Sequence, residues 1–327
     1  MKIQEIFNLA VQMGKKADPR SFGDIEKQMN RIRENYEKMS EKEKKYFLKD
    51  KLTNPYPDTA IHNMNPDKEV RKVLVGIDVT EGTVISARER STDLIIGHHP
   101  LGIGFALLGD QMSLQLNVYK KYGVPINVIE GLMQKRIEEV NRSLHAINHY
   151  IPVDAAKLLG ANLINIHTPA DNLVYDFLVN EIENKKPEFV EDVLDMLMEI
   201  PEFQESTYRG VPPRVFSGNP KNYCGLVVPT EITGGAEGSD RIYPHLINAG
   251  VGTVIAMHQS EKCVKESQKS YINVVIASHI ASDSLGMNLF LDELEKRGIE
   301  ILPTSGFIRV SRVKNEKGDI MNSINNK

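Results

Sequence analysis

The chain has 327 residues, of which 41% are hydrophobic and 26% are charged, and its formal net charge is −4 at pH 7. These fractions are typical of a globular protein that buries a sizeable core, and they argue against disorder. The small net charge argues against a nucleic-acid groove, and two cysteines are too few for a disulfide framework. Because no apolar run reaches the roughly 18 residues of a membrane span and no signal peptide pattern opens the chain, we expect a cytoplasmic protein without a membrane partner.

Residues 1–69 predict a helical N-terminal arm followed by a linker. Apolar residues recur at helical spacing over 3–13, and Gly14 is the expected helix stop. The pair Asp18-Pro19 has the pattern of a second helix start, with a capping residue followed by proline.

The second predicted helix carries an apolar seam with heptad-like spacing, formed by Ile25, Met29, Ile32, Tyr36 and Met39. Ser40 and Glu43 match a capping box that would start a third, short helix. Residues 1–51 carry a local net charge of +4. We interpret the basic side chains as belonging to helix faces that are exposed to solvent. Since the seam spans fewer than three heptads, it favours local packing or a subunit contact over a long coiled coil.

From residue 70 onward, short apolar runs alternate with helical stretches. Apolar runs typical of buried parallel strands occupy residues 73–78, 94–96, 125–129 and 163–166. Helical spacing lies between them, over 82–90, 113–122 and 131–149. This alternation predicts a first α/β lobe over 70–171.

A helical connector is predicted over 172–210, followed by a second α/β lobe over 211–327. The second lobe has predicted strands at 225–228, 252–256 and 273–277, helices at 241–249, 259–269 and 284–297, and one or two short strands over 299–310. The predicted fold class is therefore α/β, with two α/β lobes and an N-terminal helical extension.

Histidine follows an apolar strand three times, and an aspartate twice stands four residues after the histidine. The side chains involved are His98, His99, His167, Asp171, His279 and Asp283. In an open α/β sheet, ligands bind beyond the carboxyl ends of the strands, where loops from different strands converge. We therefore expect these six side chains to meet in one crevice.

Imidazole and carboxylate groups are ligands that Zn, Fe and Mn accept. Six such groups exceed the three protein ligands of one catalytic zinc, and they suit two metal ions about 3.5–4 Å apart. Alternatively, a single strand-end histidine could be a loop hydrogen-bonder, and Asp171 and Asp283 could cap the helices that follow. The adjacent pair His98-His99 has little packing value, so together the spacings favour a metal site.

Two further segments carry candidate chemistry. His258 follows the strand at 252–256 and could bond to a metal ligand or carry a proton to the site. Glu261 is a candidate general base. Both residues could equally belong to the first turn of a helix, where Glu261 would lie near the positive end of the helix dipole. The glycine-rich segment 233–240 could cradle a phosphate with backbone amides. It lacks the lysine of a Walker loop, which favours an ordinary loop.

The motifs together resemble the Nif-three-like family, whose members are also labelled type-2 homologues of GTP cyclohydrolase I. The resemblance rests on Gly-Ile-Asp-Val-Thr at 76–80, Asp-Leu-Ile-Ile-Gly-His-His-Pro-Leu at 93–101, and His-Thr-Pro-Ala-Asp at 167–171. A fourth element, Ser-His-Ile-Ala-Ser-Asp at 278–283, matches the family's Gly-His-x-x-x-Glu and is followed by the expected Gly286.

This resemblance implies two related α/β lobes with a dinuclear metal centre between them, and ring-shaped homo-oligomers from dimer to hexamer. It implies that the metal ligands are His98, His99, Asp171, His279 and Asp283. It also implies that His167 either binds a metal ion or contacts a residue that does. Asp283 stands where the family usually has glutamate. The family's Trp-Asp-Asn segment is absent, and 172–210 is too short for the inserted domain of long members.

Two functions follow as hypotheses. The first is a hydrolase with two divalent metal ions (Zn, Fe or Mn) that acts on a small, phosphorylated or heterocyclic metabolite. The second is a non-catalytic, metal-stabilised oligomer that presents its helical arm to a partner. The sequence itself specifies no guanine recognition, so a GTP cyclohydrolase activity is implied only by the family label.

Overall fold

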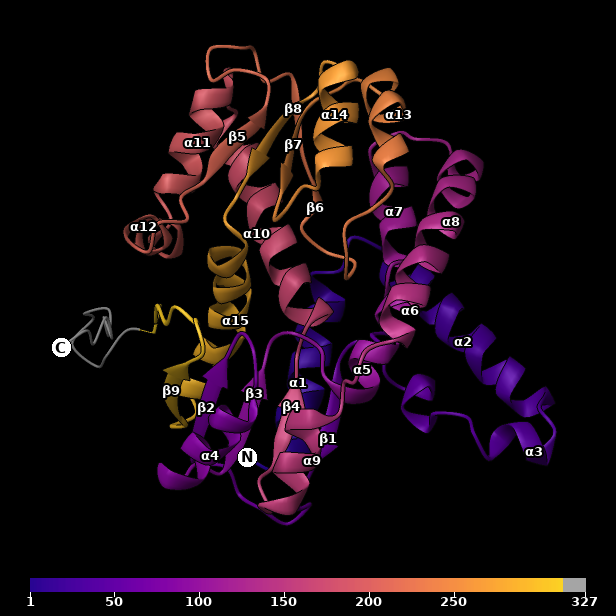
Figure 1. Cartoon of the computed structure of the whole chain (residues 1–327), viewed down its shortest axis with the longest axis vertical. Coiled ribbons are helices and arrows are strands. Elements are labelled where there is room, and N and C mark those ends of the chain that lie inside the picture. Colours follow the sequence, from indigo (N-terminus) through magenta and orange to yellow (C-terminus); the bar gives the residue numbers. More distant parts are fainter. Residues whose placement is uncertain (314–327) are drawn as a thin grey trace.

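Two β-sheets form the framework of the structure, a computed structural model that describes residues 1–313. The first sheet has the strand order β1-β4-β3-β2-β9 and the second has the order β5-β8-β7-β6. Figure 1 shows the first sheet in the lower half of the molecule and the second in the upper half, with helices α10 and α15 between them. The predicted α/β fold with two lobes and N-terminal helices is confirmed.

The first sheet is parallel except for one edge strand. Its strands are β1 (Ala60–Asn63), β2 (Lys72–Gly76), β3 (Leu94–Gly97), β4 (Leu163–Asn165) and β9 (Glu300–Thr304). Strand β1 pairs antiparallel with β4, and the other pairs are parallel. Strands β3 and β4 are buried along their whole length, as expected for central strands covered on both faces.

Strand β9 corrects the predicted division of the chain. It lies beside β2, where Lys72 pairs with Glu300, and so completes the first sheet rather than the second lobe predicted over 211–327. The reason is that α15 (His279–Glu295) leads the chain from the second sheet back to the first. Residues 314–327 of that predicted lobe lie outside the described residues.

The second sheet has the same plan, a parallel core with one antiparallel edge. It contains β5 (Arg214–Ser217), β6 (Leu226–Glu231), β7 (Val251–Ala256) and β8 (Asn273–Ile276). Strand β5, which pairs antiparallel with β8, is not among the predicted strands. Helices η2 (Asp240–Ile242), α13 (Tyr243–Asn248) and α14 (Glu261–Lys269) connect the strands.

Six helices follow the early strands of the first lobe: α4 (Glu81–Glu89), α5 (Gly102–Ala106), α6 (Leu108–Gln111), α7 (Leu114–Lys121), α8 (Ile126–His145) and α9 (Ile151–Leu158). The strand predicted at 125–129 is wrong, because these residues begin α8. A short apolar run fits a buried strand or a helix face equally well. Here Ile129 and Met133 belong to one buried stripe at helical spacing. Burial of this stripe favours the helix over a strand.

The N-terminal region is not a detached arm. Helix α1 (Ile3–Lys16) inserts its apolar face into the main core, and it runs through Gly14 instead of stopping there. Helix α2 (Phe22–Lys38) is capped by Ser21, not by Asp18. The predicted capping box of Ser40 and Glu43 is confirmed at α3 (Glu41–Lys44), which is followed by η1 (Lys49–Leu52).

Only the first part of the predicted seam is covered within the chain. Ile25 and Met29 are buried, whereas Ile32, Tyr36 and Met39 are half-buried. Figure 1 shows α2 and α3 leading away from the body of the molecule. The second half of the seam therefore lies on an outlying part of the structure.

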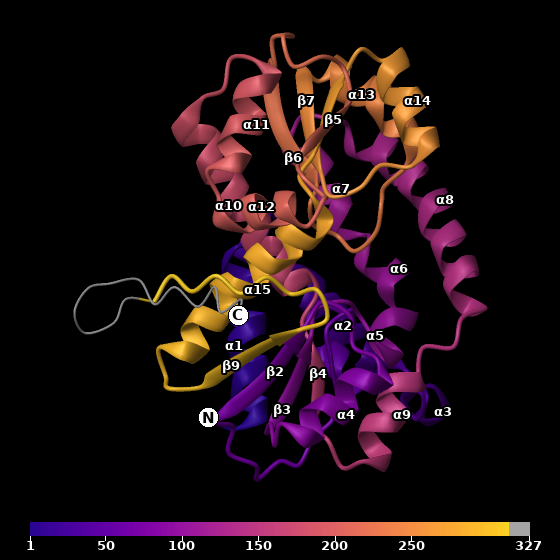
Figure 2. The same ribbon diagram turned by 60° about the vertical axis from the view of Figure 1, so that its left-hand side comes forward.

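The connector is formed by α10 (Thr168–Lys185), α11 (Val190–Met198) and α12 (Pro201–Tyr208). Helix α10 crosses α15 at very short range, since a Cβ atom added to Gly286 would lie 2.3 Å from the carbonyl oxygen of Ala170. Figure 2 shows these two helices crossing where the lobes meet. Among the described residues, no helix is long and apolar enough to span a bilayer.

Replacing Gly286 by alanine should destabilise the protein by about 1–3 kcal/mol, because the added methyl group must push α10 and α15 apart. The matched control is Gly131→Ala on α8, where the new Cβ would have no atom within 4 Å. That change should stabilise the protein by about 0.5–1 kcal/mol, because alanine favours the helix. Chemical denaturation measures both changes, and equal effects of the two substitutions would contradict the proposed helix contact.

Candidate metal centre

The ends of three strands position the candidate ligands. His98 and His99 directly follow β3, His167 follows β4 at the start of α10, and His279 is the first residue of α15 after β8. Because α10 and α15 cross closely, the strand ends of the two sheets meet at one place. The structure thus brings together all four of these strand-end histidines.

The two aspartates lie inside helices and do not cap them. Asp171 is the fourth residue of α10 and Asp283 the fifth residue of α15, while the capping positions are held by His167 and Ser278. The His-x-x-x-Asp spacing is therefore one helical turn, which places each aspartate on the same helix face as its histidine. This excludes the capping alternative for both aspartates.

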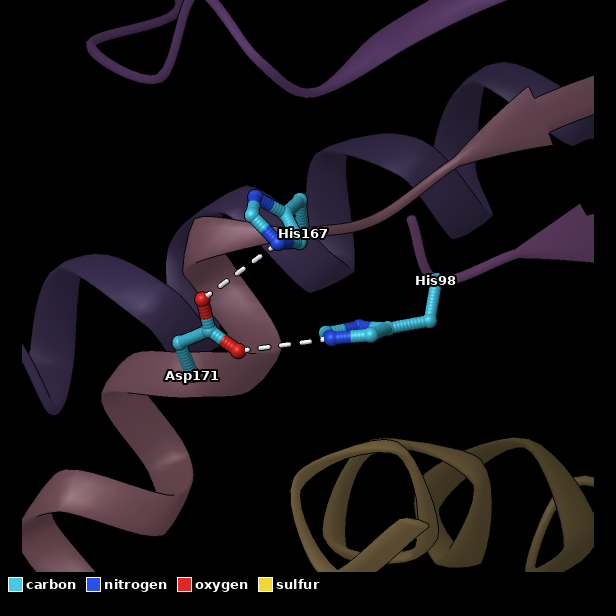
Figure 3. A group of neighbouring side chains, drawn as sticks. All are labelled: His98, His167 and Asp171. Carbon is cyan, nitrogen blue, oxygen red and sulfur yellow. Dashed lines mark ion pairs between the residues drawn. The ribbon is translucent and has the colours of Figure 1, made fainter. Parts of the chain in front are cut away.

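The side chains form two groups that share His98. One group is His98, His167 and Asp171, and the other is His98, His99 and Asp283; in each group the ligand atoms lie within 4.8 Å of one another. Figure 3 shows Asp171 directing one oxygen toward His98 and the other toward His167. The distances from Asp171 to the Nε2 atoms of these histidines are 3.4 and 3.8 Å.

Asp283 occupies the corresponding position from the other helix. Its Oδ1 lies 3.4 Å from His98 Nε2 and 3.6 Å from His279 Nε2, and its Oδ2 lies 3.3 Å from His99 Nε2. The side chain of Asp283 is fully buried, whereas that of His279 is 41% exposed. All six candidate residues therefore lie around one point, with His279 on the open side.

Each of the inner histidines has its Nδ1 atom held by an acceptor. Nδ1 lies 3.0 Å from the carbonyl oxygen of Ile166 in His98, 2.8 Å from Asp78 in His99, and 2.8 Å from Asp58 in His167. Since these partners accept hydrogen bonds, Nδ1 carries the proton in each neutral ring. Nε2 is then left with a lone pair directed at the carboxylates, which is the usual arrangement of metal-binding histidines.

Several buried polar atoms at this point have no hydrogen-bond partner among the described residues. They are Nε2 of His98, Oδ1 of Asp171, and both carboxylate oxygens of Asp283. Native proteins rarely leave such atoms unpaired. One lone-pair nitrogen and three carboxylate oxygens without donors fit a bound cation, so the residues present suit a metal ion.

The charges at the centre lead to the same conclusion. Burial opposes charge on His98, but Asp283 and Asp171 together raise its pKa well above the usual value. Burial likewise opposes charge on Asp283, yet His98 and His279 hold its pKa well below the usual range. The buried carboxylates therefore attract positive charge, as protons on the histidines or as a metal ion.

Two supporting carboxylates were not predicted from the sequence. Asp78 lies two residues after β2, as His167 lies two residues after β4, so the same strand-end signal could have identified it. Asp58 is fully buried, accepts hydrogen bonds from Thr168 Oγ1 at 2.6 Å, and holds His167. It comes from the loop before β1, and it reaches the site only because β1 pairs with β4, which no local pattern indicates.

The turn that presents His279 is strained. Ser278 has φ 57° and ψ 105°, in the left-handed region that favours glycine. The family pattern that this segment resembles has glycine at this position, and glycine adopts a positive φ without a steric cost. Such strain is typical of residues that a surrounding structure holds in place for function.

A cavity of about 250 Å³ opens beside the candidate ligands. Its lining includes the candidate ligands His99, His167, Asp171 and His279. It also includes the apolar side chains of Leu101, Phe105, Leu108, Ile232 and Met257. The same cavity is lined by Glu231, at the end of β6. A small molecule bound there would contact the metal centre and Glu231 together.

Glu231 is a buried carboxylate with two protein donors. Tyr119 donates its hydroxyl proton to one oxygen, and the Gly238 backbone N–H donates to the other at 3.0 Å. Burial raises the pKa of Glu231 to about 7, although both hydrogen bonds act to lower it. A carboxyl group that titrates near neutral pH can both accept and donate a proton.

The remaining predicted residues lie at different distances from the cavity. His258 lines it and packs its ring 5.2 Å from that of His279. Glu261, the candidate general base, is exposed at the start of α14 and is not one of the lining residues. The segment 233–240 is fixed in place, since Gln115 donates to Ala236 O and Arg136 to Glu237 O.

Comparisons with known proteins identify the relatives of this fold. The model of the Duf34/NIF3 (NGG1p interacting factor 3) family matches residues 61–121, a segment that contains Asp78, His98 and His99. The chain is similar to the crystal structure of a NIF3 superfamily protein from Sphaerobacter thermophilus, with 25% sequence identity and a TM-score of 0.67. That match covers 76% of this chain and 91% of the other.

Two weaker similarities point to other solved structures. Reduced HcgD from Methanocaldococcus jannaschii is 14% identical with a TM-score of 0.49, covering 75% of this chain and 88% of that one. A protein from Thermus thermophilus is 17% identical with a TM-score of 0.45, covering 79% and 92%. No curated protein matches the chain significantly. The predicted resemblance to the DUF34/NIF3 family is therefore confirmed, by the family model over residues 61–121 and by the Sphaerobacter structure.

Proposed function

We propose that this protein is a dinuclear metal-dependent hydrolase of a small metabolite. The observation that carries the proposal is the pair of buried His/Asp groups that share His98 and leave four ligand atoms without a hydrogen-bond partner. Two ions fit better than one because six candidate ligands exceed the three protein ligands of one catalytic ion. A neutral imidazole nitrogen has a single lone pair, so His98 can serve only one of the two ions.

The ligand sets follow from this constraint. One ion would take His98, His167 and Asp171, and the second would take His99, Asp283 and His279. Asp283 lies between them, since its two oxygens face histidines of both sets. Imidazole and carboxylate donors without thiolate fit Zn, Fe or Mn.

When bound, a metal pair supplies Lewis acidity, which makes a water molecule nucleophilic and stabilises negative charge on the reacting oxygens. The chain supplies the rest of the site. Asp58 and Asp78 fix the ring orientations of His167 and His99. The apolar walls offer a nonpolar surface to a small ligand, and Glu231 is the candidate for proton transfer in place of Glu261.

The cavity also bears on the substrate class. Among the described residues that line it, none is a lysine or an arginine. A phosphorylated or nucleotide substrate, as the GTP cyclohydrolase label of the family implies, would then place its anionic group at the metal ions and its ring or chain along the apolar walls.

A non-catalytic, metal-stabilised oligomer is the second candidate function. It is favoured by the outlying position of α2 and α3 and by exposed apolar side chains there, with Phe22 64% and Tyr46 75% exposed. A homo-oligomer from dimer to hexamer is proposed with either function. Full metal content without turnover on a broad panel of nucleotides and phosphoesters would favour this second candidate.

Purified protein should contain up to two equivalents of Zn, Fe or Mn by elemental analysis. His98→Ala should lose most of this metal, because it removes a ligand of one ion and takes away the histidine that lies beside both Asp171 and Asp283. The matched control is His145→Ala, which removes an exposed histidine at the end of α8 and should leave the metal content unchanged. Wild-type protein that stays metal-free after reconstitution with each of the three ions would exclude the proposal.

Asp58→Asn should weaken metal binding by about 10–100-fold, the usual effect of losing the partner that orients a metal-binding histidine. The control is Asp67→Asn, because the side chain of Asp67 is 91% exposed. Competition with a chromophoric chelator measures both affinities. If Asp58→Asn bound metal as tightly as wild type, Asp58 would have no orienting role.

Glu231→Gln should flatten the pH dependence of stability. The pKa of Glu231 is raised on folding, so its contribution to stability is complete below its unfolded value near pH 4.3 and is lost as the pH rises through about 7. The melting temperature of wild type should therefore fall more than that of Glu231→Gln between about pH 5 and about pH 8. The control is Glu261→Gln at an exposed position, whose melting temperature should change with pH as that of wild type does. If the melting temperature of Glu231→Gln fell as much as that of wild type, or more, Glu231 would not be the titrating group.

A further inference from the structure

Asn172, the residue after Asp171, makes hydrogen bonds in two directions. It is fully buried, and its amide nitrogen lies 3.2 Å from both the carbonyl oxygen of Gly14 and Oδ2 of Asp18. Its amide oxygen accepts a hydrogen bond from Thr233 Oγ1 at 2.7 Å. One side chain thus joins the N-terminal segment to the loop after β6.

The N-terminal side of this connection is a buried polar cluster. Asp18 pairs with Arg20 at 2.7 Å and accepts a hydrogen bond from the hydroxyl of Tyr56 at 2.9 Å. The side chains of Asp18 and Arg20 are almost completely buried. Breaking such a cluster costs free energy because each buried group would be left without a partner. The segment between α1 and α2 is therefore held in one position.

The other side of the connection is the cavity wall. Thr233 is buried, lines the cavity, and belongs to the second lobe. The Thr233–Asn172 bond is therefore a direct contact between the second lobe and α10, one residue away from a candidate metal ligand.

Backbone packing holds the same turn of α10. A Cβ atom added to Gly14 would lie 2.6 Å from the Cα atom of Pro169, and one added to Gly286 would lie 2.3 Å from Ala170 O. Helices α1 and α15 thus press on this turn from different sides. Asn172 adds side-chain hydrogen bonds from this turn to Asp18 and Thr233.

We propose that Asn172 is a positioning residue of the candidate metal centre. Through its hydrogen bonds it fixes the positions of Asp171 and of the cavity wall at Thr233 relative to the N-terminal segment. This inference rests on the proposed metal site. A purely structural network would contribute to folding stability and leave the metal site of the folded protein unchanged. A positioning residue also changes the affinity and the ligand geometry of the bound ion.

Cobalt(II) alone is the probe, because its visible absorption reports both occupancy and ligand geometry. Asn172→Ala should bind cobalt about 10–100-fold more weakly than wild type and show a changed visible spectrum. Thr233→Val is the milder variant, which removes one hydrogen bond to Asn172 and should weaken cobalt binding severalfold. If Asn172→Ala does not fold, the cobalt affinity of Thr233→Val tests the positioning role instead.

The matched control is Asn273→Ala. Asn273 is another buried asparagine with several hydrogen bonds, but it lies at the start of β8, at the opposite end of that strand from His279. This variant should lose stability and keep the wild-type cobalt affinity and spectrum. If folded Asn172→Ala and Thr233→Val behave like Asn273→Ala, the positioning role is overturned. If wild type itself binds no cobalt, the metal site fails, and with it both proposals.

Discussion

The structure depends on the close crossing of α10 and α15. Each helix begins at the end of a strand, one from each sheet, and each carries an aspartate in its first turns. Gly286 permits the backbones to approach until Ala170 O occupies the space of a side chain. This contact brings Asp171 and Asp283 each to 3.4 Å from His98 Nε2, so the geometry of the candidate metal centre is set by helix packing.

That packing has an electrostatic consequence. Two carboxylates are buried next to one imidazole nitrogen, and buried charges are costly unless they are paired. The N–H groups of the inner histidines are already directed away from the centre, toward Ile166 O, Asp58 and Asp78. A cation between the lobes is the simplest partner for these carboxylates, and the cavity gives it access to a small ligand.

The sequence predicted the part of the site that local pattern encodes. A histidine at a strand end and an aspartate one turn later are short-range signals, and His98, His167, Asp171 and Asp283 were found from them. Asp58 and β9 depend on pairing between distant segments, which one sequence does not reveal. The segment at 125–129 failed for a different reason, since a short apolar run is compatible with either a strand or a helix.

The central claim is the proposal that the His/Asp side chains where the lobes meet would hold two metal ions. Anomalous diffraction from crystals of the metal-loaded protein tests it directly. We predict two peaks in the cavity, one beside His98, His167 and Asp171 and one beside His99 and Asp283. No peak in the cavity, or peaks bound only by exposed side chains elsewhere, would contradict the account.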